Sequence, residues 1–467
     1  MYRIIISEVM IPMSKIINEN EINRSFEGFL SAAEAANVVP EAAFENFRVK
    51  RGLREMDGTG VMAGVTNIGN AHGYMLYEGE RVADEGKLEY RGFNMSAIVD
   101  GVSAENRYGF EECAYILLFG KLPTKEELDS FSALLASKRH LPPHFTEDIL
   151  MKAPSSSIMN KMAMGMLALY AYDENPDDTS LENLLRQSIE VIGRLPVIAA
   201  QSYAIYRSKF HGASLTLHTP MDGLSTAQNF LRVLRPDMQY TEEEARLLDL
   251  CMIIHAEHGG GNNSTFSCRV LSSSGTDTYS AMAAAIGSLK GPLHGGANIK
   301  VQEMFDCIKS NVGDIKDEDE VTAFLTKILR KEAYDGKGLI YGMGHAIYTK
   351  SDPRAVMLKK YAEDLAIKKG YGDDFRLLET IERVTPELFR QHKGYNKTMC
   401  ANVDLYSGLV YRMLDIPVEL YTPLFAIARV SGWCAHRIEE LQTAKKIIRP
   451  AYKSLSKPQD FIPMNER

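Results

Sequence analysis

The sequence has few cysteines and no long apolar run, and each shortage excludes a class of protein. Its six cysteines include no CxxC pair, so we expect reduced thiols in a cytoplasmic protein instead of a disulfide framework. No uninterrupted apolar stretch approaches the about 20 residues of a membrane-spanning helix. The first residues, MYRIIISEVMIPMSKII, carry Glu8 within their apolar patch and lack a small-residue cleavage site, which argues against a signal peptide.

An excess of positive charge is also missing. The chain holds 53 lysine and arginine residues against 61 aspartate and glutamate residues, which gives a net charge of −8 and a pI of about 5.9. A nucleic acid or an anionic membrane requires a clustered basic face, so neither is expected as the main partner. What is present is an ordinary globular composition, 45% hydrophobic and 24% charged, over 467 residues, a length that predicts two domains.

Apolar residues recur with helical spacing along most of the chain, whereas strand patterns are sparse. The predicted helices span residues 18–38, 113–119, 125–135, 156–172, 181–209, 224–233, 241–257, 279–289, 297–308, 318–333, 355–369, 375–391, 402–413 and 419–442. Thr124 and Glu127 form a capping-box pattern before one of them. Residues 49–95 are rich in glycine and contain two β-prone stretches, 60–68 and 73–77. We therefore predict an all-α, mainly helical fold with a small β region near the N-terminus.

Two histidine-containing runs are candidate sites. The run GPLHGGAN at residues 291–298 places His294 between a proline turn and two glycines, at a junction between helices. The run HAEHGGGNNST at residues 255–265 carries His255 and His258 on one helical face. A zinc site is one interpretation, although these histidines lie three residues apart and the zincin motif requires four. The other is a glycine-terminated helix whose end leaves His258 free to bind an anion.

A third run, GKGLIYGMGHAIYTKSDPR at residues 336–354, has four glycines before His345. Its backbone amides can approach a flat or phosphorylated ligand closely. Asp352, Pro353 and Arg354 match the N-cap, the first position and the first turn of a helix. An arginine at a helix N-terminus opposes the helix dipole, so we expect a carboxylate ligand to pair with Arg354.

Ionisable residues also interrupt apolar patterns near the C-terminus. Asp404, in ANVDLYSGLVYRML, is either a helix N-cap or a base with a raised pKa, and its neighbours favour the cap. Arg429 interrupts the apolar run LFAIARVSGW, and a lone buried arginine requires an anion. Arg449 lies in a basic segment before Pro450, which is ordinarily a solvated end.

Together these motifs resemble the citrate synthase family. The likeness rests on residues 255–262, GPLHGGAN, the run GMGHAIYTKSDPR, NVDLYSG around Asp404 and LFAIAR, and further upstream on YRGF and LLFGKLPTKEEL. It covers about residue 88 to the C-terminus, whereas residues 1–87 match less well. The resemblance implies a homodimer of two-domain chains, in which residues 1–298 and 406–467 form a large domain and residues 299–405 form a small one.

The activity implied by the resemblance is the condensation of acetyl-CoA with oxaloacetate and hydrolysis of the resulting thioester to citrate and CoA, the first step of the tricarboxylic acid cycle. Asp404 would be the base that removes a proton from the acetyl methyl group. Neutral His294 would donate a hydrogen bond to the thioester oxygen as the enolate forms. His345 would polarise and protonate the ketone of oxaloacetate.

Binding residues follow from the same resemblance. Those for the two carboxylates of oxaloacetate are His258, Asn262, Arg354, Arg429 and, reaching across the dimer interface, Arg449. Those for CoA are Ile340, Gly342, Gly344, Lys350 and Lys397, where the glycine-rich backbone receives the adenine and the lysines lie near the phosphates. Met343 and Thr349 depart from the aromatic and basic residues that relatives often carry there. No metal and no permanently bound cofactor is expected, since acetyl-CoA is a cosubstrate.

Three alternatives stay open at this point. Propionyl-CoA could replace acetyl-CoA and yield 2-methylcitrate, because one methylene in an apolar pocket changes binding by only about 1–3 kcal/mol. The chain could instead be a non-catalytic helical binding protein that keeps the fold. A metal hydrolase built on the histidine pair is the third alternative.

Overall fold

A computed structural model describes residues 19–55, 58–394 and 398–467. Contacts between residues divide the chain into two units. One comprises the chain up to Met62 together with Ala451–Arg467, and the other comprises Ala63–Pro450. The division into a large and a small domain at residues 299 and 405 stays a prediction.

The α-helices among the described residues of the first unit are α1 (Glu19–Ala36) and α2 (Glu41–Asn46). The helix predicted over residues 18–38 is therefore confirmed. Apolar side chains of α1 are largely exposed, among them Phe26 and Phe29. Arg51 forms an ion pair with Glu41 at the start of α2, and both side chains remain exposed to solvent, so this pair contributes little to stability.

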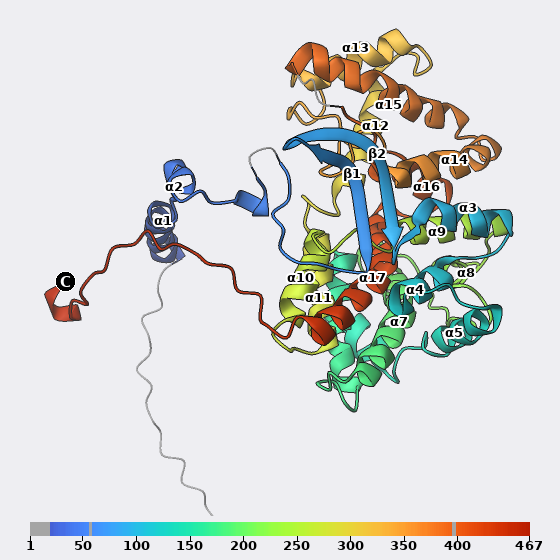
Figure 1. The fold of residues 1–467 in the computed structure, drawn as a ribbon, viewed down its shortest axis with the longest axis horizontal. Helices are drawn as coiled ribbons and strands as arrows, with labels where there is room; N and C mark the ends of the chain where they lie inside the picture. Colours follow the sequence, from blue (N-terminus) through green and yellow to red (C-terminus); the bar gives the residue numbers. More distant parts are fainter. Residues whose placement is uncertain (1–18, 56–57, 395–397) are drawn as a thin grey trace, which may run out of the picture. The chain divides into compact units, whose positions relative to one another are not determined.

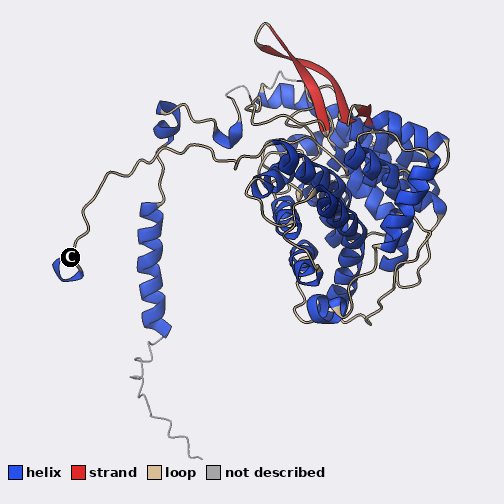
Figure 2. Ribbon diagram, turned by 60° about the horizontal axis from the view of Figure 1, so that its bottom comes forward, coloured by secondary structure: helices blue, strands red, loops and turns tan. Residues whose placement is uncertain are grey.

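The second unit is mostly helical, and Figure 2 shows strands in one small sheet. Its helices are α3 (Met95–Ala104), α4 (Phe110–Phe119), α5 (Lys125–Ser137), α6 (Ile158–Ala168), α7 (Leu181–His211), α8 (Thr226–Leu234), α9 (Glu242–His255), α10 (Asn263–Ser272), α11 (Thr278–Lys290), α12 (Ala297–Asn311), α13 (Glu318–Leu329), α14 (Pro353–Lys368), α15 (Gly372–Lys393), α16 (Val403–Met413) and α17 (Tyr421–Thr443). The predicted fold class is confirmed, and the capping box of Thr124 and Glu127 is present at α5. Within the described ranges, no helix has both the length and the apolar character to cross a membrane.

Helix α17 is the central element of the core. It packs against α4, α7, α9, α10 and α11, and Figure 1 shows it among them. Almost every side chain from Tyr421 to Arg437 is buried, and Trp433 is completely enclosed. A helix that is apolar on all sides has to be surrounded by other elements, which explains its position. Its middle carries Arg429, a charged residue in the interior of the unit.

The sheet is an antiparallel meander of β1 (Gly69–Tyr77), β2 (Glu80–Tyr90) and β3 (Phe93–Asn94). The β-prone stretch 73–77 lies within β1, but the prediction of a strand over 60–68 is wrong. The end of that stretch is held by Glu439 on α17, which accepts hydrogen bonds from Thr66 Oγ1 at 2.7 Å and from Asn67 N at 2.8 Å. A backbone N–H used in this way cannot join a strand ladder.

The β1–β2 hairpin packs closely on the loop of residues 345–352. A Cβ atom at Gly73 would lie 2.6 Å from Cα of Tyr348, and one at Gly86 would lie 3.0 Å from its Cδ1, so only glycine permits this approach. The hydroxyl of Thr349 donates to the backbone oxygen of Gly73. Thr349, which departs from the basic residue of many relatives, thus attaches the loop to the hairpin.

Candidate active site

Residues from three separate motifs meet in the second unit. The ring centroid of His258, just beyond α9, lies 5.2 Å from that of His345. Nε2 of His345 lies 3.4 Å from Nη2 of Arg354, at the start of α14. Arg429, from α17, donates from Nε to the backbone oxygen of His255 at 2.6 Å. The fold therefore gathers side chains that are up to 174 residues apart in the sequence.

His294 lies in the turn between α11 and α12, where its backbone N–H donates to the oxygen of Gly291 at 2.9 Å. Nε2 of His294 lies 3.4 Å from the backbone N of Ser264 and 3.2 Å from its Oγ, so Ser264 holds this ring nitrogen. Burial, together with the positive charge of Arg429, lowers the pKa of His294 to about 4. At neutral pH this ring is uncharged, and Nδ1 is the ring nitrogen that Ser264 does not contact.

His345 is held by the loop that carries it. Its Nδ1 accepts hydrogen bonds from the backbone N–H groups of Ile347 at 3.1 Å and Tyr348 at 3.2 Å. Its other nitrogen, Nε2, faces Nη2 of Arg354, a guanidinium group that can only donate. The ring of Tyr348 stacks on the imidazole with centroids 4.7 Å apart and an interplanar angle of 26°. These contacts fix the orientation of the imidazole.

Arg354 has a carboxylate partner within the chain. Asp352 accepts from Nε of Arg354 at 3.0 Å and from Nη2 at 2.7 Å, and both side chains are buried. Asp352 also caps α14 by accepting from the backbone N–H of Arg354, as the sequence predicted. Asp352 therefore already supplies one carboxylate to Arg354, and the pairing of Arg354 with a carboxylate ligand stays a prediction.

Unlike Arg354, Arg429 has no carboxylate partner among the residues that the structure describes. Its side chain is 0% exposed, and apart from the bond made by Nε, neither Nη1 nor Nη2 has a hydrogen-bond partner among the described residues. Burial is the main reason that its pKa falls to about 10, so the group remains charged at neutral pH. Nε2 of His258 is likewise buried without a partner in the described parts of the chain. Two orphaned polar groups in the interior indicate a site for an anion.

Asp404 occupies the first turn of α16, and the residue that caps this helix is Asn402, whose side chain accepts from the backbone N–H of Asp404 at 3.0 Å. The interpretation of Asp404 as the cap is wrong. Because Asn402 has taken that role, the carboxylate is not committed to the helix terminus. Burial raises the pKa of Asp404 to about 6, although the nearby guanidinium of Arg354 opposes the shift.

A short backbone pairing connects the loop of His345 to the start of α16. Met343 and Ala401 form an isolated antiparallel bridge, and Asn402 donates from its backbone to the oxygen of Gly342 and from its side chain to that of Gly344, both at 2.8 Å. The backbone N–H of Gly344 donates to the oxygen of Cys400, so this amide is not available to a ligand as the sequence suggested. The pairing fixes the loop that carries His345 relative to Asp404.

The remaining candidate residues differ in their environment. Ile340 is buried, whereas Lys350 is exposed, and Lys397 lies outside the described residues. Asn262, at the N-cap position of α10, accepts from Ser264 Oγ at 2.9 Å and makes no capping bond. Arg449 is exposed in the segment after α17 and pairs with none of the other described site residues. A role for Arg449 across an interface stays a prediction.

Sequence reasoning missed Glu257, the neighbour of His258. Its side chain is fully buried and accepts a hydrogen bond from Nε2 of His436, on α17, at 2.9 Å. Burial alone would raise the pKa of Glu257, but His436 and Arg429 lower it below the usual value. The negative charge of Glu257 therefore lies near the positive charge of Arg429. The HAEH run contains this glutamate, but nothing in the pattern shows that it is buried.

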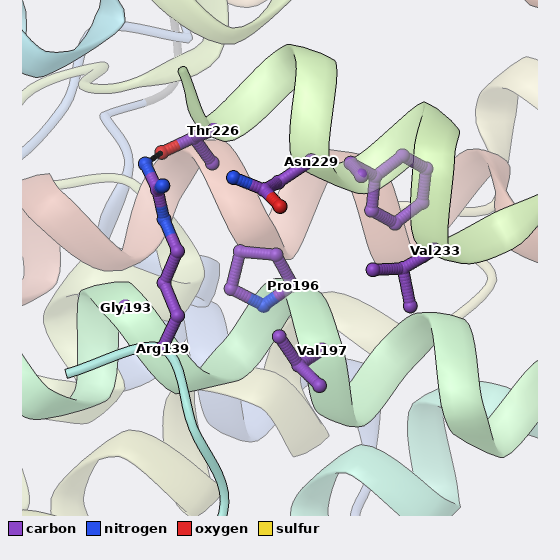
Figure 3. Close-up of a pocket in the computed structure, with 8 residues that line it drawn as sticks. Arg139, Gly193, Pro196, Val197, Thr226, Asn229 and Val233 are labelled. Carbon is purple, nitrogen blue, oxygen red and sulfur yellow. Dashed lines mark hydrogen bonds between the residues drawn. The ribbon is translucent and has the colours of Figure 1, made fainter. Parts of the chain in front are cut away.

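Figure 3 shows a cavity elsewhere in the second unit, between α7 and α8, beside Arg139, Pro196 and Thr226. Its volume is about 10 Å³, which accommodates about one water molecule and no organic ligand. Arg139 is already occupied there, since it donates to the backbone oxygen of Leu224 at 2.6 Å. We interpret this cavity as a packing defect beside the proline of α7.

In this helical fold, His258 and Arg429 are buried and have nitrogen atoms without a partner among the described residues, and a carboxylate of raised pKa, Asp404, belongs to the same group of motifs. These are features of an enzyme for a small anionic substrate. The chain belongs to the citrate synthase family. The family profile of citrate synthase, C-terminal domain, matches residues 57–451, so the family region begins before the residue 88 expected from the motifs.

Individual relatives agree with this assignment. The citrate synthase of Synechocystis sp. is 34% identical over 389 residues, which cover 82% of this chain and 89% of that protein. The 2-methylcitrate synthase of Shewanella oneidensis is 33% identical over 387 residues, covering 81% and 92%. Among solved structures, the ternary complex of carboxymethyl coenzyme A and oxaloacetate with citrate synthase from Thermoplasma acidophilum is 26% identical, with a TM-score of 0.73, and covers 90% of this chain and 99% of its own.

Proposed function

We propose that the protein is a cytoplasmic, homodimeric acyltransferase that condenses acetyl-CoA with oxaloacetate and hydrolyses the product thioester to citrate and CoA. The observation that carries this proposal is the buried guanidinium of Arg429, whose Nη1 and Nη2 have no partner within the described residues. A buried cation with two unused donors in one plane matches a carboxylate. Membership of the citrate synthase family supports the same reaction.

In the proposed mechanism Asp404 removes a proton from the methyl group of acetyl-CoA. A carboxylate with a pKa of about 6 is still ionised at pH 7 and above, and is a stronger base than an ordinary aspartate. The methyl proton is nevertheless far less acidic, so the enolate needs stabilisation as it forms. A ring N–H group of neutral His294 donates to the thioester oxygen and supplies it.

The enolate carbon then attacks the ketone carbon of oxaloacetate, and the ketone oxygen takes a proton from the ring of His345. The two carboxylates of oxaloacetate contact His258, Asn262, Arg354 and Arg429, with Arg449 contributed by the second protomer. CoA lies against Ile340, Gly342 and Gly344, with its phosphates near Lys350 and Lys397. Water then hydrolyses the citryl thioester, which releases citrate and CoA.

The acyl group is the least constrained part of the proposal, because both citrate and 2-methylcitrate synthases are relatives. One assay decides it: the release of free thiol is followed with oxaloacetate and either acetyl-CoA or propionyl-CoA. We expect a higher kcat/KM with acetyl-CoA and no release without oxaloacetate. A higher kcat/KM with propionyl-CoA would assign 2-methylcitrate synthesis, and no release from either thioester would support a non-catalytic binding protein.

The activity should depend on pH through Asp404. Only the ionised form is a base, so kcat/KM for acetyl-CoA should be constant above pH 7 and fall about tenfold per unit below an apparent pKa of about 6. His294 has a pKa of about 4 and stays neutral across this range. The measurement is a pH profile between 5 and 8 at constant ionic strength. A value of kcat/KM that stays constant down to pH 5 would contradict a base with a raised pKa.

A further inference from the structure

Tyr348 contacts three residues of the candidate active site. It lies in the loop between His345 and Arg354 and is only 2% exposed. Its ring stacks on His345, meets the ring of His258 edge-on with centroids 5.5 Å apart, and has the guanidinium carbon of Arg354 5.4 Å from its centroid. The tyrosine therefore contacts three groups on which the proposed reaction depends.

The hydroxyl of Tyr348 is buried and has no hydrogen-bond partner in the described parts of the chain. The positive charges of Arg354 and Arg429 both act on this hydroxyl, although burial has the larger effect and raises its pKa. A hydroxyl withdrawn from water without a partner costs free energy, so its retention needs a reason. The Nη atoms of Arg429, whose charge acts on this hydroxyl, and Nε2 of His258, whose ring meets that of Tyr348, also have no partner among the described residues. One shared ligand would satisfy all of them.

The β1–β2 hairpin prevents Tyr348 from moving toward another partner. Gly73 packs against the backbone of Tyr348, and Gly86 packs against the edge of its ring. The backbone N–H of Tyr348 donates to Nδ1 of His345. The hydroxyl is therefore fixed in place before any ligand arrives, and a preorganised donor loses little entropy when it binds.

We propose that Tyr348 is a substrate-binding residue whose hydroxyl donates a hydrogen bond to a carboxylate of oxaloacetate. This inference rests on the proposed function. Asp352 already pairs with Arg354, whereas the two Nη groups of Arg429 have no partner among the described residues. Those two groups cannot occupy all the lone pairs of a dicarboxylate. The hydroxyl adds a donor without adding a charge.

The test is Tyr348→Phe, which keeps the ring that stacks on His345 and removes only the hydroxyl. We expect the dissociation constant of oxaloacetate, measured by titration calorimetry without thioester, to rise about tenfold or more. The KM for oxaloacetate should rise in parallel, while kcat stays within about twofold, since the missing bond lies away from the reacting carbon. The melting temperature of the ligand-free variant should not fall, because no satisfied hydrogen bond is lost.

Tyr279→Phe is the matched control. Tyr279 is also fully buried, but its hydroxyl donates to Asp173 at 2.7 Å and lies in α11, outside the site. This variant should lower the melting temperature and leave oxaloacetate binding unchanged. If Tyr348→Phe bound oxaloacetate as tightly as the wild type, the inference would be overturned and the proposed function would stand. If the wild type itself bound no oxaloacetate, the proposed function would fail.

Discussion

Replacing Asp404 by alanine is expected to lower kcat on the order of 10³-fold while oxaloacetate still binds. The carboxylate has no capping role, since Asn402 holds the end of α16, so its loss should leave the helix intact. Removing it also takes a negative charge away from Arg354, near the proposed position of a dianion. The affinity for oxaloacetate should therefore be equal or slightly higher.

The measurement combines thiol release at saturating substrates with calorimetric titration of oxaloacetate. Asp364→Ala is the control, because Asp364 is an exposed aspartate on α14, the helix that begins beside Arg354. It should match the wild type in both measurements. Turnover at the wild-type rate in Asp404→Ala would refute the assignment of this residue as the base.

Replacing Arg429 by methionine is expected to abolish most oxaloacetate binding without destabilising the protein. Its two Nη groups have no partner among the residues described, so the side chain is a buried charge with one hydrogen bond, made by Nε. Exchanging such a charge for an apolar side chain of similar length removes a desolvation penalty. We expect the dissociation constant for oxaloacetate to rise about 10²-fold or more, and the melting temperature of the ligand-free protein to stay or rise.

Arg437→Met provides the comparison, since Arg437 is buried in the same helix eight residues later. All three nitrogens of that guanidinium are satisfied, by Thr278 Oγ1 at 3.0 Å, Ser272 Oγ at 3.2 Å and the oxygen of Thr276 at 2.6 Å. This variant should lower the melting temperature and bind oxaloacetate normally. The opposite pattern, with Arg429→Met unstable and still able to bind, would show that Arg429 has a structural role.

Most of the fold could be predicted from the sequence because local signals agree with the packing. Helices such as α5 and α14 begin at side chains that satisfy their own first N–H groups, and each buries an apolar stripe that recurs with helical spacing. For the stretch 60–68, local signals predicted a strand that the structure does not contain. The end of this stretch is held by Glu439, more than 370 residues away, and no local pattern contains that contact.

The candidate site shows the same limit at the level of single charges. The motifs identify Arg354 and Arg429 as cations of the site, but they predict an anionic ligand for both. The structure separates them, since Arg354 is paired with Asp352 and Arg429 has no carboxylate partner in the described residues. Asp404 and Asn402 also differ in a way that the sequence does not show. Either residue type could cap α16, and in the structure Asn402 does so.

The sequence by itself determined the helical class of the protein, the family to which it belongs and the residue types of the candidate site, because hydrophobic spacing and motif order are properties of the chain. Only the tertiary structure decided which of those side chains are buried, which are paired and which keep polar atoms without a partner among the described residues. These properties depend on distances between distant segments and on exclusion of water, as the unmet donors of Arg429 and Tyr348 illustrate.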